Sequence, residues 1–402
     1  MKNTDEKISY LDLFFCPKQN LYTYLEIYKQ YSPNEKAFTN LILYFIANVI
    51  AVSKESKLLV YQSGLFGEIA SSINLSQDPI EDIDVKIFFL SQLSVSSIYE
   101  NDIMFSLQLQ KIYFDVILLR EELLLRDEHR DITYILNNSL WGLANVSFCE
   151  NDTFINNFIK FDIISYIINS NSKSQVVLNP SLKIIGNLLS NKEEFVNKII
   201  SPELFHYLIE NICYKNNDIS IKSIGLWAMS NIFSDENQQK YIFQYNLPDI
   251  LNDLFELNFP PDSEIDKEIA FQIGKYIEIS NDEAVVVLIK KYDICSLQKK
   301  MLEKYSYNLR NMCHIYKCHL IMTSLIGIVS KNGEGGKLAV EIFNKNGMTD
   351  LIERVILQCS NPIDNEYMKK KVEEIEKMGE IILDEYLSSD TRTISNDDNE
   401  DI

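Results

Sequence analysis

The amino-acid sequence predicts an all-α protein built from repeated units of three helices. Two observations favour this fold class. Only 12 Gly and 9 Pro occur among the 402 residues, which is too few turn-forming residues for a fold with many strands and suits helices joined by short loops. In addition, one helical motif recurs along the chain, in which an aromatic residue is followed four positions later by Asn.

The motif is recognisable in the segments YFIAN, FFLSQ, WGLAN, KIIGN, WAMSN and FQIGK, and in weaker form in TSLIG. Its last residues stand at positions 48, 92, 145, 187, 231, 275 and 327, so the intervals are 44, 53, 42, 44, 44 and 52 residues. Most intervals match the roughly 40–47 residue period of armadillo and HEAT repeats. The longer two predict insertions, one near 97–100 or 126–130 and one within 281–307. We therefore predict a right-handed superhelical solenoid of about seven armadillo-type three-helix repeats, because one unit cannot bury its apolar face alone.

One unit shows most clearly how its three helices divide. A short helix over Glu193–Ile200, a medium helix over Pro202–Tyr214 and a longer third helix over Asp218–Phe233 are separated by breaks rich in Asn, Lys and Ser. Pro202 suits the first turn of a helix, where its missing N–H would be unpaired anyway. The aromatic/Asn motif lies late on the third helix.

We expect a single solenoid over residues 1–387, with capping helices at both ends. Glu366–Leu387 has apolar residues spaced along a highly charged helix, which fits a C-terminal cap with a polar outer face. Residues 388–402 are polar and acidic and are predicted to be a disordered tail.

Charge and cysteine content limit the kinds of partner and compartment. With 38 Lys+Arg against 58 Asp+Glu, the formal charge of −20 disfavours nucleic acid and anionic membrane surfaces as partners. A basic partner is favoured, although acidity can also serve solubility alone. The seven scattered Cys indicate reduced thiols, and neither a signal peptide nor a long uninterrupted apolar run is evident. We expect a protein of the cytoplasm and nucleus that neither enters nor binds a membrane.

The repeated motif offers groups that can bind a peptide. Residues four apart share one helix face, so Trp141 lies beside Asn145 and Trp227 beside Asn231. Stacked repeats would align these pairs into a ladder in which each Asn amide clamps the backbone of an extended peptide. Slots between the rings would take Lys or Arg stems, with acids such as Asp235 and Glu150 at the slot ends. The alternative is that Trp and Asn serve only packing between repeats and helix-end hydrogen bonds.

The segments WGLANVSF, KIIGNLLSN and WAMSNIFSD resemble third helices of importin-α, the armadillo adaptor of nuclear import. The resemblance in period covers Glu35 to Ser360, and the distinctive motifs lie within Leu140–Asp235. It implies a groove that binds the basic, Lys/Arg-rich nuclear localisation signal of a cargo protein. The implied peptide-binding residues are Trp141, Asn145, Asn187, Trp227, Asn231 and Asp235.

The sequence departs from that family in several places. The Arg/Lys-rich segment that binds importin-β in the family has no counterpart, which leaves coupling to importin-β doubtful. Lys183 stands where the pattern has Trp, and Lys275 where it has Asn, so either cation would repel a basic peptide locally. Gln92 keeps both functions of an amide. A second function therefore stays open, that of an armadillo scaffold that holds a protein partner by another surface.

No motif predicts catalysis, a metal site or a cofactor. The stretch CHIYKCH contains Cys313, His314, Cys318 and His319, but one helix does not bring all four together, so we interpret it as an ordinary helix face. SKNGEGGK (330–337) lacks the ending of a phosphate-binding loop and is expected to be a loop between helices. We therefore expect a protein that is not an enzyme.

Overall fold

The computed structural model describes residues 18–31, 35–94, 103–126, 132–148, 151–170, 174–213, 217–361, 363 and 365–387. These residues form helices joined by short connections, with no strand among them. The chain divides into two compact units, Met1–Asn191 and Lys192–Ile402, which are described separately. The expected single solenoid over 1–387 stays a prediction, and the expected tail, 388–402, lies outside the described residues.

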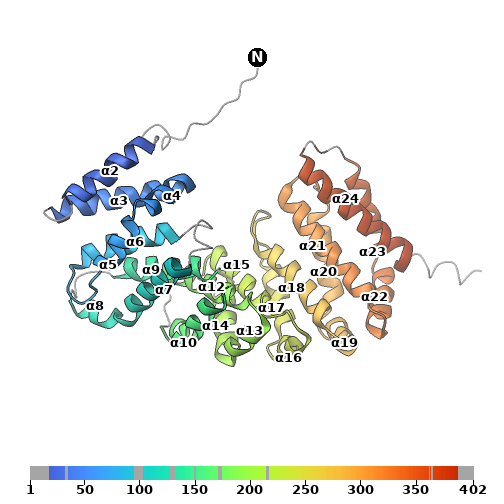
Figure 1. The fold of residues 1–402 in the computed structure, drawn as a ribbon. Helices are drawn as coiled ribbons and strands as arrows, with labels where there is room; N and C mark the ends of the chain where they lie inside the picture. The colour runs from blue at the N-terminus through green and yellow to red at the C-terminus, as the bar shows by residue number, and fades with distance from the viewer. Residues whose placement is uncertain are drawn as a thin grey trace, which may run out of the picture. The chain divides into compact units, whose positions relative to one another are not determined.

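The first unit contains these helices: α2 (Lys18–Tyr31), α3 (Lys36–Val52), α4 (Lys54–Gln62), α5 (Leu65–Ser72), α6 (Ile80–Ser94), α7 (Ile103–Leu118), α8 (Arg120–Arg126), α9 (Thr133–Val146), α10 (Asp152–Phe161), α11 (Ile163–Ser170) and α12 (Gln175–Leu189). Four of them, α3, α6, α9 and α12, pack against one another in series (Figure 1). Their buried sides are mostly apolar, as Ile46, Phe89 and Leu143 illustrate. α2 covers α3 at the start of the series.

The second unit repeats this arrangement. Its helices are α13 (Glu193–Ile199), α14 (Pro202–Cys213), α15 (Ile219–Ser230), η2 (Glu236–Gln238), α16 (Gln239–Gln244), α17 (Leu247–Glu256), α18 (Ile265–Ile279), α19 (Asp282–Lys290), α20 (Ile294–Tyr305), α21 (Met312–Val329), α22 (Glu334–Lys345), α23 (Met348–Cys359), α24 (Glu366–Ile381) and the π-helix η3 (Ile382–Leu387). Here α15, α18, α21 and α24 pack in series. The predicted all-α solenoid of three-helix repeats is confirmed.

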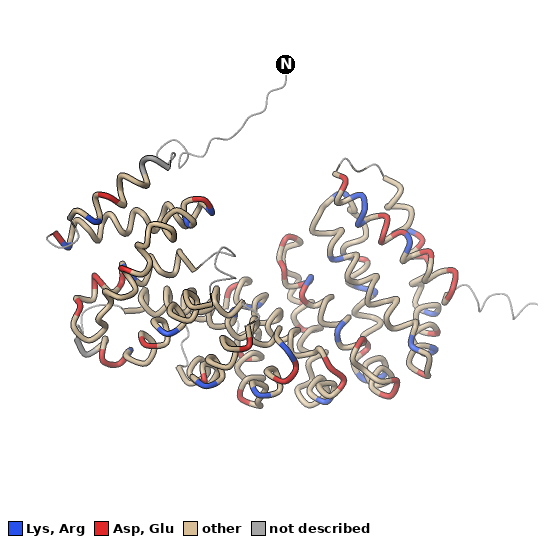
Figure 2. Tube along the Cα trace, in the orientation of Figure 1, with Lys and Arg blue, Asp and Glu red and all other residues tan. Residues whose placement is uncertain are grey.

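Several predicted elements lie where the sequence placed them. α13, α14 and α15 match the three helices expected over 193–233, and the carboxylate of Asp218 caps α15 by accepting the N–H of Ile221 at 2.9 Å. Residues 366–387, which were expected to form a C-terminal cap, form α24 followed by η3, and their role as a cap stays a prediction. α24 buries Val372, Ile375 and Gly379 against its neighbours and carries charged residues along the rest of its length (Figure 2).

The position of the insertions is only partly resolved by the structure. Residues 97–100 and 127–130 lie outside the described part of the chain. Of the second long interval, part is a longer third helix, since α21 has 18 residues and α18 has 15.

The expectation that the glycine-rich stretch 330–337 is entirely a loop is wrong. Gly335 and Gly336 belong to the first turn of α22 and not to a loop. The cause is tertiary, because the carboxylate of Asp282 in α19 accepts the N–H groups of Glu334 and Gly335, both at 2.9 Å. A Cβ on Gly333 would lie 2.1 Å from that carboxyl carbon, so glycine allows the close approach.

Within the described residues, α21 is long and apolar enough to cross a membrane by length and composition. Just over half of it, 56%, is buried inside the protein, where it packs between α18 and α24. Its charged residue Lys317 is buried as well and donates to the carbonyl oxygen of Ser263 at 2.7 Å. These contacts are those of a core helix.

Candidate functional site

The repeated motif forms one exposed face on the first unit. Each third helix presents two residues spaced four apart that are at least partly exposed, and the positions between them are buried except for the partly exposed Phe45. We call these eight residues the rung face: Tyr44 and Asn48 on α3, Phe88 and Gln92 on α6, Trp141 and Asn145 on α9, and Lys183 and Asn187 on α12. Because the four helices pack in series, the residues implied at 141, 145 and 187 lie on neighbouring helices.

The Asn side chains of this face bond within the protein. Asn187 donates from Nδ2 to the carbonyl oxygen of Ala144 at 2.9 Å and to Oγ of Ser147 at 3.0 Å. Asn145 donates to Oγ of Ser94, on α6, at 3.2 Å. Both amides thus link successive third helices, as the packing alternative requires. Since both N–H groups of Asn187 are donated, this amide can offer a peptide only its acceptor oxygen.

An aromatic stack with an acid beside it stands at the α3–α6 end of the rung face. The rings of Tyr44 and Phe88 are stacked, with centroids 4.6 Å apart and planes at 22°. Burial raises the pKa of Tyr44, and the negative charge of Asp84 and the ionised form of Tyr134 raise that pKa further. Asp84 precedes Phe88 by four residues on α6 and is partly exposed.

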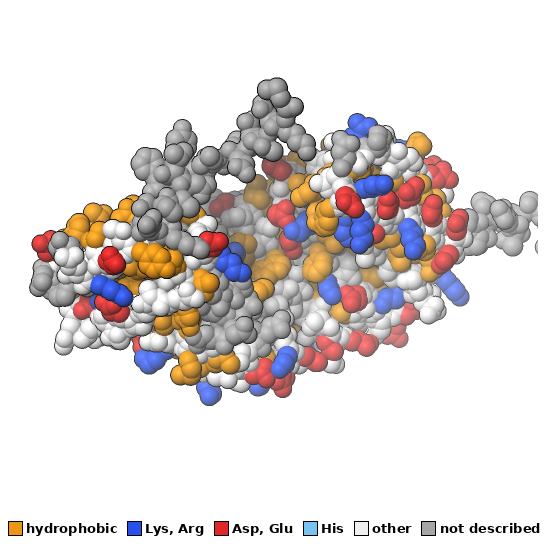
Figure 3. All heavy atoms as spheres, turned by 45° about the horizontal axis from the view of Figure 1, so that its top comes forward, with side chains coloured by type: hydrophobic (Ala, Val, Ile, Leu, Met, Phe, Trp, Pro, Cys, Tyr) orange, Lys and Arg blue, Asp and Glu red, His pale blue; other side chains and the backbone are white. Residues whose placement is uncertain are grey.

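Asp84 and Tyr134 were absent from the residues expected to bind. The sequence could have indicated both. Asp84 precedes Phe88 by four residues on α6, and Tyr134 precedes Trp141 by seven residues on α9, so each shares a helix face with its motif residue. Tyr134 is 65% exposed, which leaves its ring accessible. Hydrophobic side chains are visible at the surface of the first unit in Figure 3.

The α9–α12 end of the rung face is different. The ammonium nitrogen of Lys183 lies 4.9 Å from the centroid of the Trp141 ring, a cation–π contact. α9 has no charged residue, and Lys183 is the sole charged residue of α12. In the resembled family, a cation of the cargo would lie against such a ring. Here Lys183 of the chain itself lies over the Trp141 ring.

In the second unit, Trp227 and Asn231 lie at the end of α15 and are partly exposed. Asp235 has a local structural role, because its carboxylate accepts the N–H of Asn237 at 2.8 Å and caps η2. Lys275 of α18 is paired with Glu278 at 2.8 Å. This pair partly offsets the repulsion that Lys275 was expected to exert on a basic peptide. Glu150 lies outside the described residues.

The CHIYKCH stretch of α21 lacks the geometry of a metal centre. His314 is buried, with Nδ1 3.2 Å from the carbonyl oxygen of Tyr305, while Nε2 of His319 lies 2.9 Å from a carboxylate oxygen of Glu374 on α24. In the part of the chain that the structure describes, no three His, Cys, Asp or Glu side chains are grouped to hold a metal ion.

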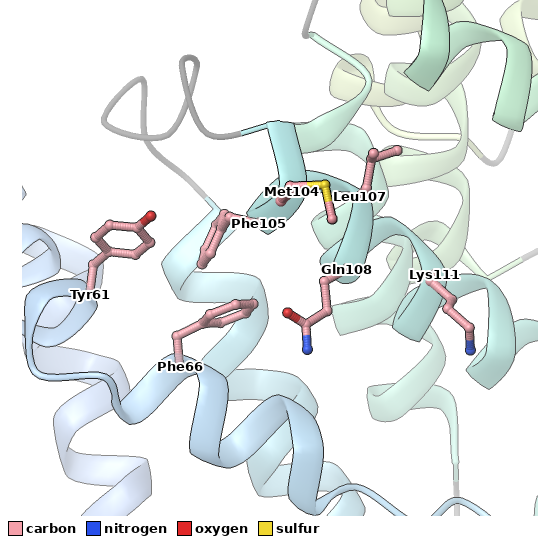
Figure 4. Close-up of a pocket in the computed structure, with 7 residues that line it drawn as sticks. All are labelled: Tyr61, Phe66, Met104, Phe105, Leu107, Gln108 and Lys111. Atoms are coloured by element: carbon pink, nitrogen blue, oxygen red, sulfur yellow. The ribbon is translucent and has the colours of Figure 1, made fainter.

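A separate apolar depression of about 540 Å³ lies between α4, α5 and α7 (Figure 4). Its base is made by Phe66 and Phe105, whose ring centroids are 4.0 Å apart. Tyr61, Met104, Leu107, Gln108 and Lys111 complete the lining. Lys111 is its one ionisable group apart from the tyrosine and is paired with Asp115 at 2.6 Å.

Comparison with known proteins bears on the fold. No family model and no curated protein matches the chain. Among solved structures, it is similar to two engineered proteins of the Northeast Structural Genomics Consortium, each with a TM-score of 0.50. The first is 15% identical over 67% of this chain and 96% of the other, and the second is 16% identical over 66% and 98%. A designed armadillo repeat protein in complex with the peptide (KR)4 has a TM-score of 0.49, with 14% identity over 62% of this chain and 98% of that one.

At these identities the likeness concerns the fold alone. The fold is an all-α solenoid of armadillo-type repeats.

Proposed function

We propose that this chain binds an extended segment of a partner protein along the rung face, and that basic side chains of the segment enter the α3–α6 end. The observation that carries the proposal is the Tyr44–Phe88 stack, with Asp84 four residues before Phe88 on the same face of α6. An aromatic surface takes the aliphatic stem of Lys or Arg and attracts its cation by about 0.5–2 kcal/mol, and a nearby carboxylate adds a charge-assisted contact.

The charge of the whole chain supports a basic ligand. With a formal charge of −20, the protein attracts a Lys/Arg-rich segment at long range and speeds its encounter, an effect that salt weakens. The resemblance of the third helices to importin-α extends the proposal to an import adaptor for basic nuclear localisation signals, present in cytoplasm and nucleus. Microscopy of a fluorescently tagged chain tests the localisation.

A second candidate function is a scaffold that holds a partner by another surface. The Asn145 and Asn187 donors are used within the protein, and Lys183 already covers Trp141. Both features favour this candidate because they leave fewer amide donors and less aromatic surface for a bound peptide.

Titration of the purified chain with a fluorescein-labelled Lys/Arg-rich peptide, at two salt concentrations, tests the proposal by fluorescence anisotropy. Asp84→Asn should weaken binding several-fold and make it less sensitive to salt, and Phe88→Ala should weaken it at both salt concentrations. Leu118→Ala is the matched control, because Leu118 ends α7, a helix that carries no rung-face residue, and is 67% exposed. Equal affinity of wild type, Asp84→Asn and Phe88→Ala would reject the proposed face.

A double variant, Trp227→Ala with Asn231→Ala, separates the two units. Loss of binding in this variant, with Phe88→Ala unaffected, would place the peptide on the second unit. A pull-down that recovers one stable non-basic partner, unaffected by every rung-face variant, would favour the scaffold.

A further inference from the structure

The two ends of the rung face carry opposite charge. At the α3–α6 end, Asp84 lies four residues before Phe88 on the same face of α6, and the ring of Phe88 is stacked on that of Tyr44. At the α9–α12 end, the one charged side chain on the two helices is Lys183. The face as a whole is therefore divided along its length, whereas a groove for a uniformly basic peptide would be acidic throughout.

Lys183 has the environment of a ligand-binding lysine. Its side chain is exposed, and its ammonium nitrogen lies over Trp141 at 4.9 Å. Among the described residues, no carboxylate pairs with it, although the protein has 58 Asp+Glu. The cation–π contact holds the ammonium at the surface of the indole without neutralising its charge.

Lys183 determines which charge a ligand side chain can carry where it contacts Trp141. A Lys or Arg of the ligand would have to displace Lys183 or lie beside it, where like charges repel. An Asp or Glu would instead pair with the exposed ammonium, and its aliphatic carbons would contact the indole. The preference is therefore for a carboxylate.

We infer that the partner segment is bipolar, with a basic residue at Tyr44, Phe88 and Asp84 and an acidic residue at Lys183 and Trp141. This inference rests on the proposed peptide-binding function. The two positions are two helix-to-helix steps apart, and each step is about 8–10 Å between helix axes. An extended chain advances about 3.3 Å per residue, so the two charges should be about five to six residues apart.

The probes are fluorescein-labelled synthetic peptides. One has two Lys, a neutral four-residue spacer and two Glu, and is made in both chain directions because the direction of binding is open. The reference peptides replace the two Glu by Gln or by Lys. Anisotropy with the full chain at low salt should show the better bipolar peptide binding at least fivefold more tightly than the all-basic peptide, with the Gln peptide between them.

Charge reversal at Lys183 gives the decisive comparison. Lys183→Glu should reverse the order, so that the all-basic peptide binds more tightly than the bipolar one, and Lys183→Gln should abolish the difference. Lys160→Glu is the matched control, because it makes the same change in net charge at an exposed position of α10 in the same unit and should preserve the wild-type order. Lys183 is exposed, so circular dichroism should show these variants folded as the wild type is.

The outcomes distinguish the two proposals. If no peptide binds, or if Phe88→Ala leaves every affinity unchanged, the proposed function fails and this inference fails with it. If Phe88→Ala weakens binding but the all-basic peptide binds wild type best, or if Lys183→Glu and Lys160→Glu act alike, the bipolar segment alone is rejected.

Discussion

Asn187 donates a hydrogen bond to the backbone carbonyl of Ala144, 2.9 Å away on the preceding third helix. The residue that the repeated motif marks as a peptide ligand is thus also a tie between neighbouring repeats. Any loss of peptide binding in an Asn187 variant must therefore be compared with its loss of stability.

Replacing Asn187 should destabilise the first unit. Asn187→Ala removes the bonds to Ala144 and Ser147, each worth about 0.5–1.5 kcal/mol, so we expect a loss of about 1–3 kcal/mol in urea unfolding. Asn48→Ala is the control, because Asn48 is exposed and bonds within its own helix to Tyr44. Its change should stay within about 0.5 kcal/mol. Equal stability of the two variants would contradict a structural role for Asn187.

A pair of glycine variants tests the close packing of α7 against α9. A Cβ on Gly142 would lie 2.2 Å from the fully buried ring of Tyr113, so Gly142→Ala should cost about 1–3 kcal/mol or more through overpacking. Gly67, within α5, has no atom within 4 Å of its added Cβ. Gly67→Ala should therefore leave stability unchanged or raise it by up to about 1 kcal/mol. Thermal unfolding of both variants measures the contrast, and a stabilised Gly142→Ala protein would show the packing to be wrong.

Asp282 should stabilise the start of α22 from the neighbouring repeat. Asp282→Ala removes the acceptors of the Glu334 and Gly335 N–H groups, and loss of such a cap costs about 0.5–2 kcal/mol. Hydrogen exchange should be faster at the first turn of α22 than in wild type. Asp262→Ala serves as the control because Asp262 is exposed. Unchanged exchange in the Asp282 variant would exclude this cap.

Stability should fall on mild acidification because of His314. Burial lowers the pKa of His314, the nearby Lys317 lowers it further, and the bond to the Tyr305 carbonyl opposes both. Because the folded-state pKa lies below the ordinary value of about 6.5, the unfolded chain takes up the proton first. This contribution to stability is fully present above about pH 6.5 and is lost as pH falls through the folded-state pKa.

The measurement compares urea unfolding at pH 7.5 and pH 5.5. His314→Gln should lose less stability between the two conditions than wild type does. His206→Gln, at an exposed position of α14, should lose as much as wild type. A wild-type loss no larger than that of His314→Gln would remove His314 as the cause.

Much of the fold follows from local features of the chain. The motif period located the third helices, and the breaks around Pro202 and Asp218 located α13, α14 and α15 within a few residues. These features can be read from sequence because helix periodicity, proline and capping residues act over one or two turns. The glycines of 335–336 were misplaced because the group that starts α22 is Asp282, about fifty residues earlier.

The candidate site divides in the same way. The four-residue spacing alone determined that the motif residues share a face on each helix, and composition determined that the protein is acidic. Only the tertiary structure decided that Asn187 turns its amide to Ala144, that Tyr44 stacks on Phe88 and that Lys183 covers Trp141. Each of these contacts joins residues about forty positions apart, and their geometry depends on how two helices pack, which no local pattern encodes.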